Sequence, residues 1–312
     1  MTDFFIRLYS LAHFREENIY LSKIRLYSLL RFVVRLFANI ILPLWYMMTP
    51  NKKFSVDPSS CFVVSLTSFP MRIGRVWITI ESIFRQTYKP SSIILWLSKE
   101  QFPNGELDLP KVLIKMRKRG LEIKFVEGDI RSHKKYKYLV GAGASLDFVT
   151  IDDDIIYSST LLQRLYEEHR KYPSDVIAAY VHEMTYDHKN ALLPYKSWNH
   201  NTLKNKNLFF GSGGGTYFPK GIFYKDVTNT DMAIKLCPTA DDVWLNSQVR
   251  LAGHTVRRLP LVKRYVFLEI IRFRDIKLNT QNVYNEHLND KQICEVVNTY
   301  LTLEQRGIFV KE

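Results

Sequence analysis

Residues 147–155 read DFVTIDDDI, and this stretch decides the fold class. Residues 147–151 are predicted to form a strand, mostly apolar after Asp147, and three consecutive aspartates follow it. Adjacent carboxylates at the end of a buried strand repel one another and are costly unless a cation neutralises them. In an extended chain Asp152 and Asp154 would face the same way, with Asp153 opposite. A solvated acidic turn is the alternative, but the place at a strand end favours a hard divalent cation, Mg²⁺ or Mn²⁺.

Further apolar runs on both sides of this stretch alternate with helical patterns. The predicted strands are residues 62–66, 93–97, 121–126 and 176–181. The predicted helices are residues 76–86, 109–119 with Gly120 as the C-cap, 134–144, and a helix capped by Ser158 or Ser159 that runs to Lys171. This alternation predicts an α/β fold with an open, mainly parallel sheet and helices on both faces. Ligands bind such sheets beyond the carboxyl ends of the strands.

The composition is that of an ordinary globular protein of 312 residues, 46% hydrophobic and 24% charged. The formal net charge of +13 favours phosphates, nucleic acids or anionic lipid surfaces without choosing among them. Cys61, Cys237 and Cys294 are odd in number and have no CxxC spacing. A disulfide framework and a cysteine zinc site are therefore not expected, and a reducing compartment fits best.

The N-terminal region contains an apolar segment over residues 24–48, IRLYSLLRFVVRLFANIILPLWYMM. Arginines interrupt it, and its uncharged part, residues 36–48, is shorter than the ~20 residues of a spanning helix. Two interpretations remain: an amphipathic helix at a membrane surface, or a helix packed against the rest of the chain. The basic net charge and the aromatic content favour the membrane surface. Residues 51–60 indicate a linker.

Asp241 and Asp242 lie at an expected helix start, after Pro238 and Thr239. Acidic residues in a first turn suit the helix dipole, which is a structural explanation. The functional explanation is a general base, because a positioned carboxylate can remove a proton from an attacking hydroxyl.

A glycine-rich run at residues 210–217, FGSGGGTY, lacks the Lys-Ser/Thr ending of a P-loop. It indicates either close approach of the backbone to a ligand or a flexible hairpin. Residues 129–135, DIRSHKK, place Lys134 and Lys135 where they could meet diphosphate charge, or where they simply begin a solvated helix.

Taken together, six stretches resemble family 2-like glycosyltransferases of bacterial capsule and lipopolysaccharide clusters. They are VVSLTSFPMRI, GDIRSHKKYKYLV, FVTIDDDIIY, FFGSGGGTYFPKG, LCPTADDVWLNSQVRLAG and NEHLNDKQ, in an order and spacing that agree over residues 61–300. The resemblance implies a GT-A fold, Rossmann-like, over residues 56–275. It leaves residues 1–55 as an N-terminal helical, membrane-associating segment and residues 276–312 as a C-terminal helical extension.

The resemblance also implies an activity: metal-dependent, inverting transfer of a hexose from a nucleotide-diphosphate donor, expected to be a UDP-sugar. The acceptor would be a saccharide or a lipid-linked saccharide in surface polysaccharide synthesis. The enzyme would be cytoplasmic and peripheral on the inner face of the bacterial plasma membrane, with no nucleic acid partner.

Particular residues receive roles from the same resemblance. The catalytic base would be Asp242, or its neighbour Asp241, which stands where the family usually has Glu. The metal, Mn²⁺ or Mg²⁺, would be held by Asp152, Asp154 and His287. The nucleotide-sugar would meet Thr67, Ser68, Phe69, Arg72, Lys134, Lys135, Asp152 and Asp153. The loop between donor and acceptor would contain Gly213, Gly214, Gly215 and Trp244.

A non-catalytic, basic nucleotide- or nucleic-acid-binding protein is the alternative function. It would use the positive charge together with aromatic side chains such as Tyr136, Tyr138 and Trp198. It leaves the aspartates at residues 152–154 and Asp242 without a role.

Overall fold

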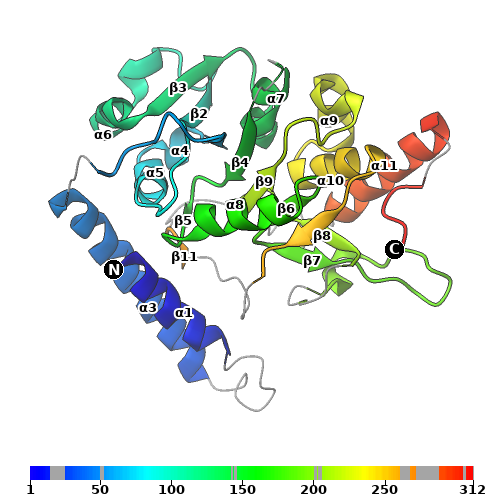
Figure 1. Cartoon of the computed structure of the whole chain (residues 1–312), viewed down its shortest axis with the longest axis horizontal. Helices are drawn as coiled ribbons and strands as arrows, with labels where there is room; N and C mark the ends of the chain where they lie inside the picture. The colour runs from blue at the N-terminus through cyan, green and yellow to red at the C-terminus, as the bar shows by residue number, and fades with distance from the viewer. Residues whose placement is uncertain are drawn as a thin grey trace.

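The computed structural model describes residues 1–14, 25–49, 53–141, 143, 146–199, 202, 206–260, 268–271, 288–304 and 307–311. At its centre is a seven-stranded sheet with the order β10-β6-β9-β4-β1-β2-β3 (Figure 1). Its strands are β1 (Phe62–Thr67), β2 (Ile93–Ser98), β3 (Leu121–Val126), β4 (Asp147–Ile151), β6 (Val176–Ala178), β9 (Gly214–Phe218) and β10 (Val256–Arg258). Every neighbouring pair is parallel except that β9 runs antiparallel to β4 and β6. The predicted α/β class is therefore confirmed.

Alternate side chains of the strands enter two separate cores, one on each face of the sheet, as a doubly covered sheet requires. On one face, Phe62, Val64 and Leu66 of β1 pack with α4, α5, α6 and α8. On the other face, Phe148 of β4 packs with α7, α9, α10 and α11. The bounds are α4 (Pro70–Ile73), α5 (Val76–Phe84), α6 (Lys111–Met116), α7 (Lys134–Gly141), α8 (Leu161–Lys171), α9 (Thr230–Leu236), α10 (Asp241–Leu251) and α11 (Leu288–Glu304).

Most predicted elements are present at the predicted places, with differences at their ends. The helix predicted over 109–119 is α6 followed by a 3₁₀ turn, and it ends at Gly120, whose φ of 100° is left-handed. The strand predicted over 176–181 ends at Ala178. The chain then forms β7 (Val181–Glu183), which pairs with β8 (Leu208–Phe210) in a separate two-stranded sheet.

The predicted capping of α8 by Ser158 or Ser159 is wrong. Thr160 is the N-cap residue and makes no side-chain capping hydrogen bond. Both serines instead donate to Asp3 of α1 (Thr2–Phe14): Ser158 Oγ lies 2.8 Å and Ser159 N lies 3.0 Å from Asp3 Oδ1. A carboxylate from another helix thus occupies the start of α8, where the helix dipole favours negative charge.

The N-terminal helices α1 and α3 (Arg25–Met48) lie side by side along one edge of the molecule (Figure 1). Val34, Ala38, Leu42 and Tyr46 form the buried face of α3, in one cluster with residues of α1, α5, β5 (Ile155–Ile156) and β11 (Leu268–Glu269). The segment therefore packs against the rest of the chain. Within the described residues Tyr27–Met48 is the one helix that could cross a membrane by length and composition, although it contains arginines.

Candidate active site

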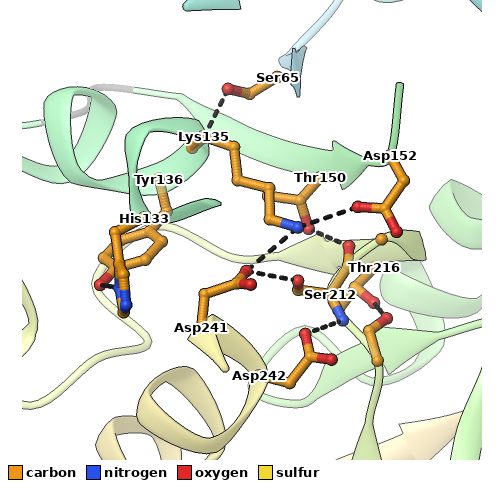
Figure 2. Close-up of polar contacts among 12 residues, drawn as sticks. Ser65, His133, Lys135, Tyr136, Thr150, Asp152, Ser212, Thr216, Asp241 and Asp242 are labelled. Atoms are coloured by element: carbon orange, nitrogen blue, oxygen red, sulfur yellow. Dashed lines mark hydrogen bonds and ion pairs between the residues drawn. The ribbon is translucent and has the colours of Figure 1, made fainter. Parts of the chain in front are cut away.

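Three elements meet at the carboxyl edge of the sheet. They are the aspartate turn at residues 152–154, the glycine-rich loop between β8 and β9, and the first turn of α10 (Figure 2). Parallel strands end together at this edge, so the aspartate turn lies where α/β sheets bind ligands.

Asp152 is the exposed carboxylate of the aspartate turn, with 44% of its side chain accessible. Its Oδ1 lies 3.1 Å from Nζ of Lys135, and its backbone N–H donates to the carbonyl oxygen of Gly213 over 3.1 Å. A Cβ atom on Gly213 would lie 1.9 Å from Cγ of Asp152. Only glycine allows the loop to approach this carboxylate so closely, which favours the ligand-approach interpretation of the glycine run over a merely flexible hairpin.

Asp153 and Asp154 have different partners from Asp152. Strand β4 ends at Ile151, so the strand alternation that would place Asp152 and Asp154 on one side does not continue into the turn. Asp153 is buried and accepts hydrogen bonds from Ser68 Oγ at 2.6 Å and from Arg72 Nη1 at 2.8 Å. Burial raises the pKa of Asp153 despite these contacts.

Arg72 also lies 3.5 Å from a carboxylate oxygen of Asp154. The Arg72 guanidinium thus supplies part of the positive charge that the sequence predicts beside the three aspartates. Phe69 supports this arrangement, because the Arg72 guanidinium lies 5.0 Å from its ring centroid.

Lys135 is the buried cation of the site, with 4% of its side chain exposed. Its Nζ lies 3.1 Å from Asp152 Oδ1 and 3.1 Å from Asp241 Oδ2 (Figure 2). Burial would lower the pKa of Lys135, but Asp152, Asp241 and Asp242 raise it above its usual value, so the amine stays charged. Lys134 points elsewhere and pairs with Asp129. Of the two predicted phosphate-binding lysines, only Lys135 therefore lies in this site.

Asp241 and Asp242 begin α10 and share one partner, Ser212 of the glycine-rich loop. Ser212 Oγ donates to Asp241 Oδ2 over 2.7 Å, and Ser212 N donates to Asp242 Oδ1 over 2.7 Å. Burial and then the charge of Asp241 raise the pKa of Asp242 to about 7. Burial opposes ionisation of Asp241 as well, but the charge of Lys135 and the hydrogen bond from Ser212 outweigh it and lower the pKa of Asp241.

Sequence reasoning missed the residues that hold α10 in place. His133 is buried, its Nε2 lies 2.8 Å from the carbonyl oxygen of Cys237, and burial lowers its pKa, so it stays neutral. Gln292 of α11 accepts from the backbone N–H groups of Thr239 and Ala240 over 3.0 and 3.1 Å. The C-terminal helix thereby replaces the side-chain cap that Ala240 cannot supply.

The remaining predicted site residues are Thr67, Gly214, Gly215, Trp244 and His287. Thr67 Oγ1 donates to the carbonyl oxygen of Trp96 at the end of β1. Gly214 and Gly215 belong to strand β9, where Gly215 has a φ of 92°. The assignment of Trp244 to the donor–acceptor loop is wrong: its side chain is fully buried, and its Nε1 donates to Val227 O over 3.1 Å. His287 lies outside the described residues.

A divalent cation fits the carboxylate chemistry in part. Among the described residues no group of three or more His, Cys, Asp and Glu side chains could hold a metal by itself. Asp152 is nevertheless exposed beside the glycine loop, whereas Asp153 and Asp154 face Arg72. Mg²⁺ commonly uses one or two carboxylates and completes its coordination with substrate phosphates and water. Asp152 is therefore the described residue that would hold such an ion.

Comparisons with known proteins found similarity only at the level of structure: no family model matches the sequence, and no curated protein matches it. Residues 1–349 of S. aureus TarS in complex with UDP align at 11% identity with a TM-score of 0.45, over 78% of this chain and 72% of that one. A mannosyltransferase from Pyrobaculum calidifontis in complex with GDP-Man and Mn²⁺ aligns at 11% identity with a TM-score of 0.46, over 88% and 75%. A CMP:2-keto-3-deoxy-manno-octonic acid synthetase complexed with CTP aligns at 12% identity with a TM-score of 0.37, over 64% and 89%.

Proposed function

We propose that this chain is a glycosyltransferase that uses a nucleoside-diphosphate sugar and transfers the sugar in a single, inverting displacement. The observation that carries the proposal is the pair of carboxylates at the start of α10. Asp242 has a pKa raised to about 7, and it lies beside the charged pair formed by Lys135 and the exposed Asp152. A proton acceptor and a phosphate-binding cation thus lie at one edge of the sheet.

Asp242 has the properties of a general base for a sugar hydroxyl. A general base works best when its pKa is near the working pH, since it is then largely deprotonated and still has a high affinity for a proton. Asp242 is partly exposed, whereas Asp241 is buried and ion-paired with Lys135. Asp241 thus supports the site by raising the pKa of its neighbour, and Asp242 takes the proton as the hydroxyl attacks the anomeric carbon.

Lys135 and Asp152 serve the leaving group in this scheme. The bond between the anomeric carbon and the diphosphate oxygen breaks, and its electron pair stays on the diphosphate. The added negative charge of the diphosphate must be stabilised. A divalent cation, Mn²⁺ or Mg²⁺, held by Asp152 would neutralise the diphosphate oxygens. Lys135 lies within reach of Asp152, stays charged, and adds a fixed positive charge where that negative charge develops. Single displacement requires no enzyme nucleophile, and the acceptor carries its own.

The expected donor is a UDP-sugar carrying a hexose, and the expected acceptor is a saccharide or a lipid-linked saccharide of a bacterial surface polysaccharide. We place the enzyme in the cytoplasm, peripheral on the inner face of the plasma membrane. The support for this location is the apolar outer surface of α3, on which Phe32, Phe37, Ile40 and Leu44 are exposed.

A donor screen tests the proposal. The full chain is incubated with UDP- and GDP-sugars, Mn²⁺ or Mg²⁺ and saccharide acceptors, and nucleotide release and the anomeric configuration of the product are measured. We expect release with one donor class, loss of release in EDTA, and inverted configuration. Full turnover in EDTA would overturn the metal requirement, and retained configuration would overturn the single displacement. No turnover, together with tight binding of single-stranded RNA, would favour the non-catalytic alternative.

A further inference from the structure

The outer face of α3 carries a continuous apolar stripe. Phe37, Ile40, Leu44 and Met47 follow one another at helical spacing, and each is about half exposed or more. Leu29, Leu30, Phe32 and Met48 of α3 and Phe4 and Leu11 of α1 extend the exposed surface. Soluble proteins rarely leave such a continuous apolar surface without a binding partner.

The charges of the two helices fit an anionic bilayer better than an acidic or neutral protein surface. Arg7 on α1 is exposed and Arg31 on α3 is half-buried, whereas Arg35 is paired with Glu269 on the inner side. The only acidic residue in residues 1–14 and 25–48 is Asp3. Asp3 accepts hydrogen bonds from Ser158 and Ser159, just before α8. An apolar stripe with basic residues beside it is the pattern of a helix that lies in the headgroup region of a membrane.

The inner side of α3 makes hydrogen bonds and an ion pair with strand β11 and the residues that follow it. Asn39 Nδ2 donates to the carbonyl oxygen of Glu269 over 3.1 Å, and Ile271 N donates to Asn39 Oδ1 over 2.8 Å. The Asn39 amide thus makes the pair of hydrogen bonds that a neighbouring strand would make. Arg35 adds an ion pair with Glu269, with Nη2 2.9 Å from Oε2.

Strand β11 in turn holds the aspartate turn. It pairs with β5, the strand that begins directly after Asp154, and Ile270 N donates to the carbonyl oxygen of Asp154 over 2.7 Å. Ile156 of β5 is buried in the same apolar cluster as the inner face of α3. Asp3 of α1 accepts hydrogen bonds from Ser158 and Ser159, which follow β5. The two helices therefore hold the segment that follows the turn presenting Asp152, α3 through β11 and α1 through the serines after β5.

We propose that α1 and α3 form a membrane-responsive clamp on the donor site. The outer stripe docks on an anionic bilayer, and docking stabilises the position in which Asn39 and Asp3 fix the segment behind the aspartate turn. Since the lipid binds the docked helices and the docked helices favour the ordered turn, lipid binding tightens donor binding, and donor binding tightens lipid binding equally. This inference rests on the proposed donor site at Asp152.

The test uses the full chain with UDP and Mn²⁺ as the donor-site probe. The dissociation constant of UDP is measured with vesicles of phosphatidylglycerol and phosphatidylcholine, with vesicles of pure phosphatidylcholine, and without vesicles. Vesicle binding is followed by co-sedimentation. We expect the anionic vesicles to tighten UDP binding by about fivefold or more, the lower range of coupling between sites.

Two variants separate docking from coupling. Phe37→Asp should lose vesicle binding and keep the UDP affinity that wild type shows without vesicles. Asn39→Ala should still bind vesicles but lose the tightening. Arg35→Gln gives a milder loss if Asn39→Ala lowers the melting temperature too far. Ile234→Asp, an exposed apolar site on α9, is the matched control and should behave as wild type.

Three results would contradict the clamp. Equal UDP affinity with and without bound vesicles would overturn the coupling alone. A second contradicting result is that the wild-type chain does not bind vesicles but dimerises in sedimentation velocity, and that Phe37→Asp abolishes the dimer. This result would assign the stripe to a second copy of the chain. A wild-type protein that binds vesicles but no nucleotide would overturn the proposed function itself, and the clamp with it.

Discussion

Asp241 and Asp242 are neighbours in the first turn of α10, yet their surroundings move their pKa values in opposite directions. Lys135 Nζ lies 3.1 Å from Asp241 Oδ2 and lowers the pKa of Asp241 against the effect of burial, whereas burial and then the charge of Asp241 raise the pKa of Asp242. The sequence shows two adjacent aspartates and does not tell which of them would act as the general base. The difference comes from Lys135, which lies more than a hundred residues earlier in the chain, and no local pattern contains it.

Asp242→Asn should stabilise the protein at alkaline pH. The pKa of Asp242 is about 7 in the folded chain, against ~3.9 for an unfolded aspartate. The folded state therefore holds the proton more tightly, so wild-type stability is lost as the pH rises from about 4 to about 7. Asparagine has no such proton. We expect the melting temperature of Asp242→Asn to exceed that of wild type at pH 8, with a gap that shrinks toward pH 4.

The control for this prediction is Asp231→Asn, which changes an exposed acid in the first turn of α9. It should show no pH-dependent gain. A lower melting temperature of Asp242→Asn than of wild type at pH 8 would mean that the charged carboxylate stabilises the fold, contrary to the origin assigned to its pKa.

Among the elements, the glycine-rich loop and strand β9 were the hardest to predict. Gly214 and Gly215 look like loop residues, but they begin β9, which runs antiparallel between β4 and β6. The apolar strands β1, β2 and β4 were predicted because burial on both faces leaves a plain sequence signal. Trp244 was misplaced for a related reason: its place beside Asp242 in sequence says nothing about its side chain, which points into the core.

Gly213→Ala should weaken donor binding by displacing Asp152. The new Cβ would lie 1.9 Å from Asp152 Cγ, so the carboxylate must move by an ångström or more. Misplacement on that scale can cost on the order of 10²-fold in kcat/KM for the donor. Gly74→Ala is the matched control, because Gly74 has a helical φ of −65° and no atom within 4 Å of the new Cβ. Equal kcat/KM values for the two variants would contradict the assigned role of the close approach.

At the scale of the whole molecule, the N-terminal segment is joined to the rest of the chain more firmly than its sequence suggests. Arg85 is buried, pairs with Glu81, and donates to the carbonyl oxygens of Tyr46 and Thr49 at the end of α3. Its guanidinium also lies 4.5 Å from the centroid of Trp45. Such contacts between distant parts of the chain leave no periodic signal, so the sequence indicates the helix without its docking surface.

Deleting residues 1–50 should therefore destabilise the protein. The deletion leaves Arg85 without its partners on α3 and uncovers the apolar cluster around Ile78, Ile156 and Leu268. A hydrogen bond to a charged group typically contributes about 1.5–3 kcal/mol to stability. Urea unfolding of the truncated and full-length chains measures the difference, with Phe37→Asp as the full-length control that alters only the outer face. An unchanged unfolding midpoint would show that the segment is an independent appendage.

The central claim, that Asp242 is the base of a sugar transfer, is tested most directly by measuring donor binding and transfer together in Asp242→Asn. The asparagine keeps an oxygen for the Ser212 N–H but cannot take a proton. With Asp231→Asn as control and folding checked by melting temperature, we expect kcat/KM for transfer to fall by about 10²-fold or more, the usual scale for a lost base. The dissociation constant for the donor nucleotide should stay unchanged. Full transfer activity in Asp242→Asn would contradict the account.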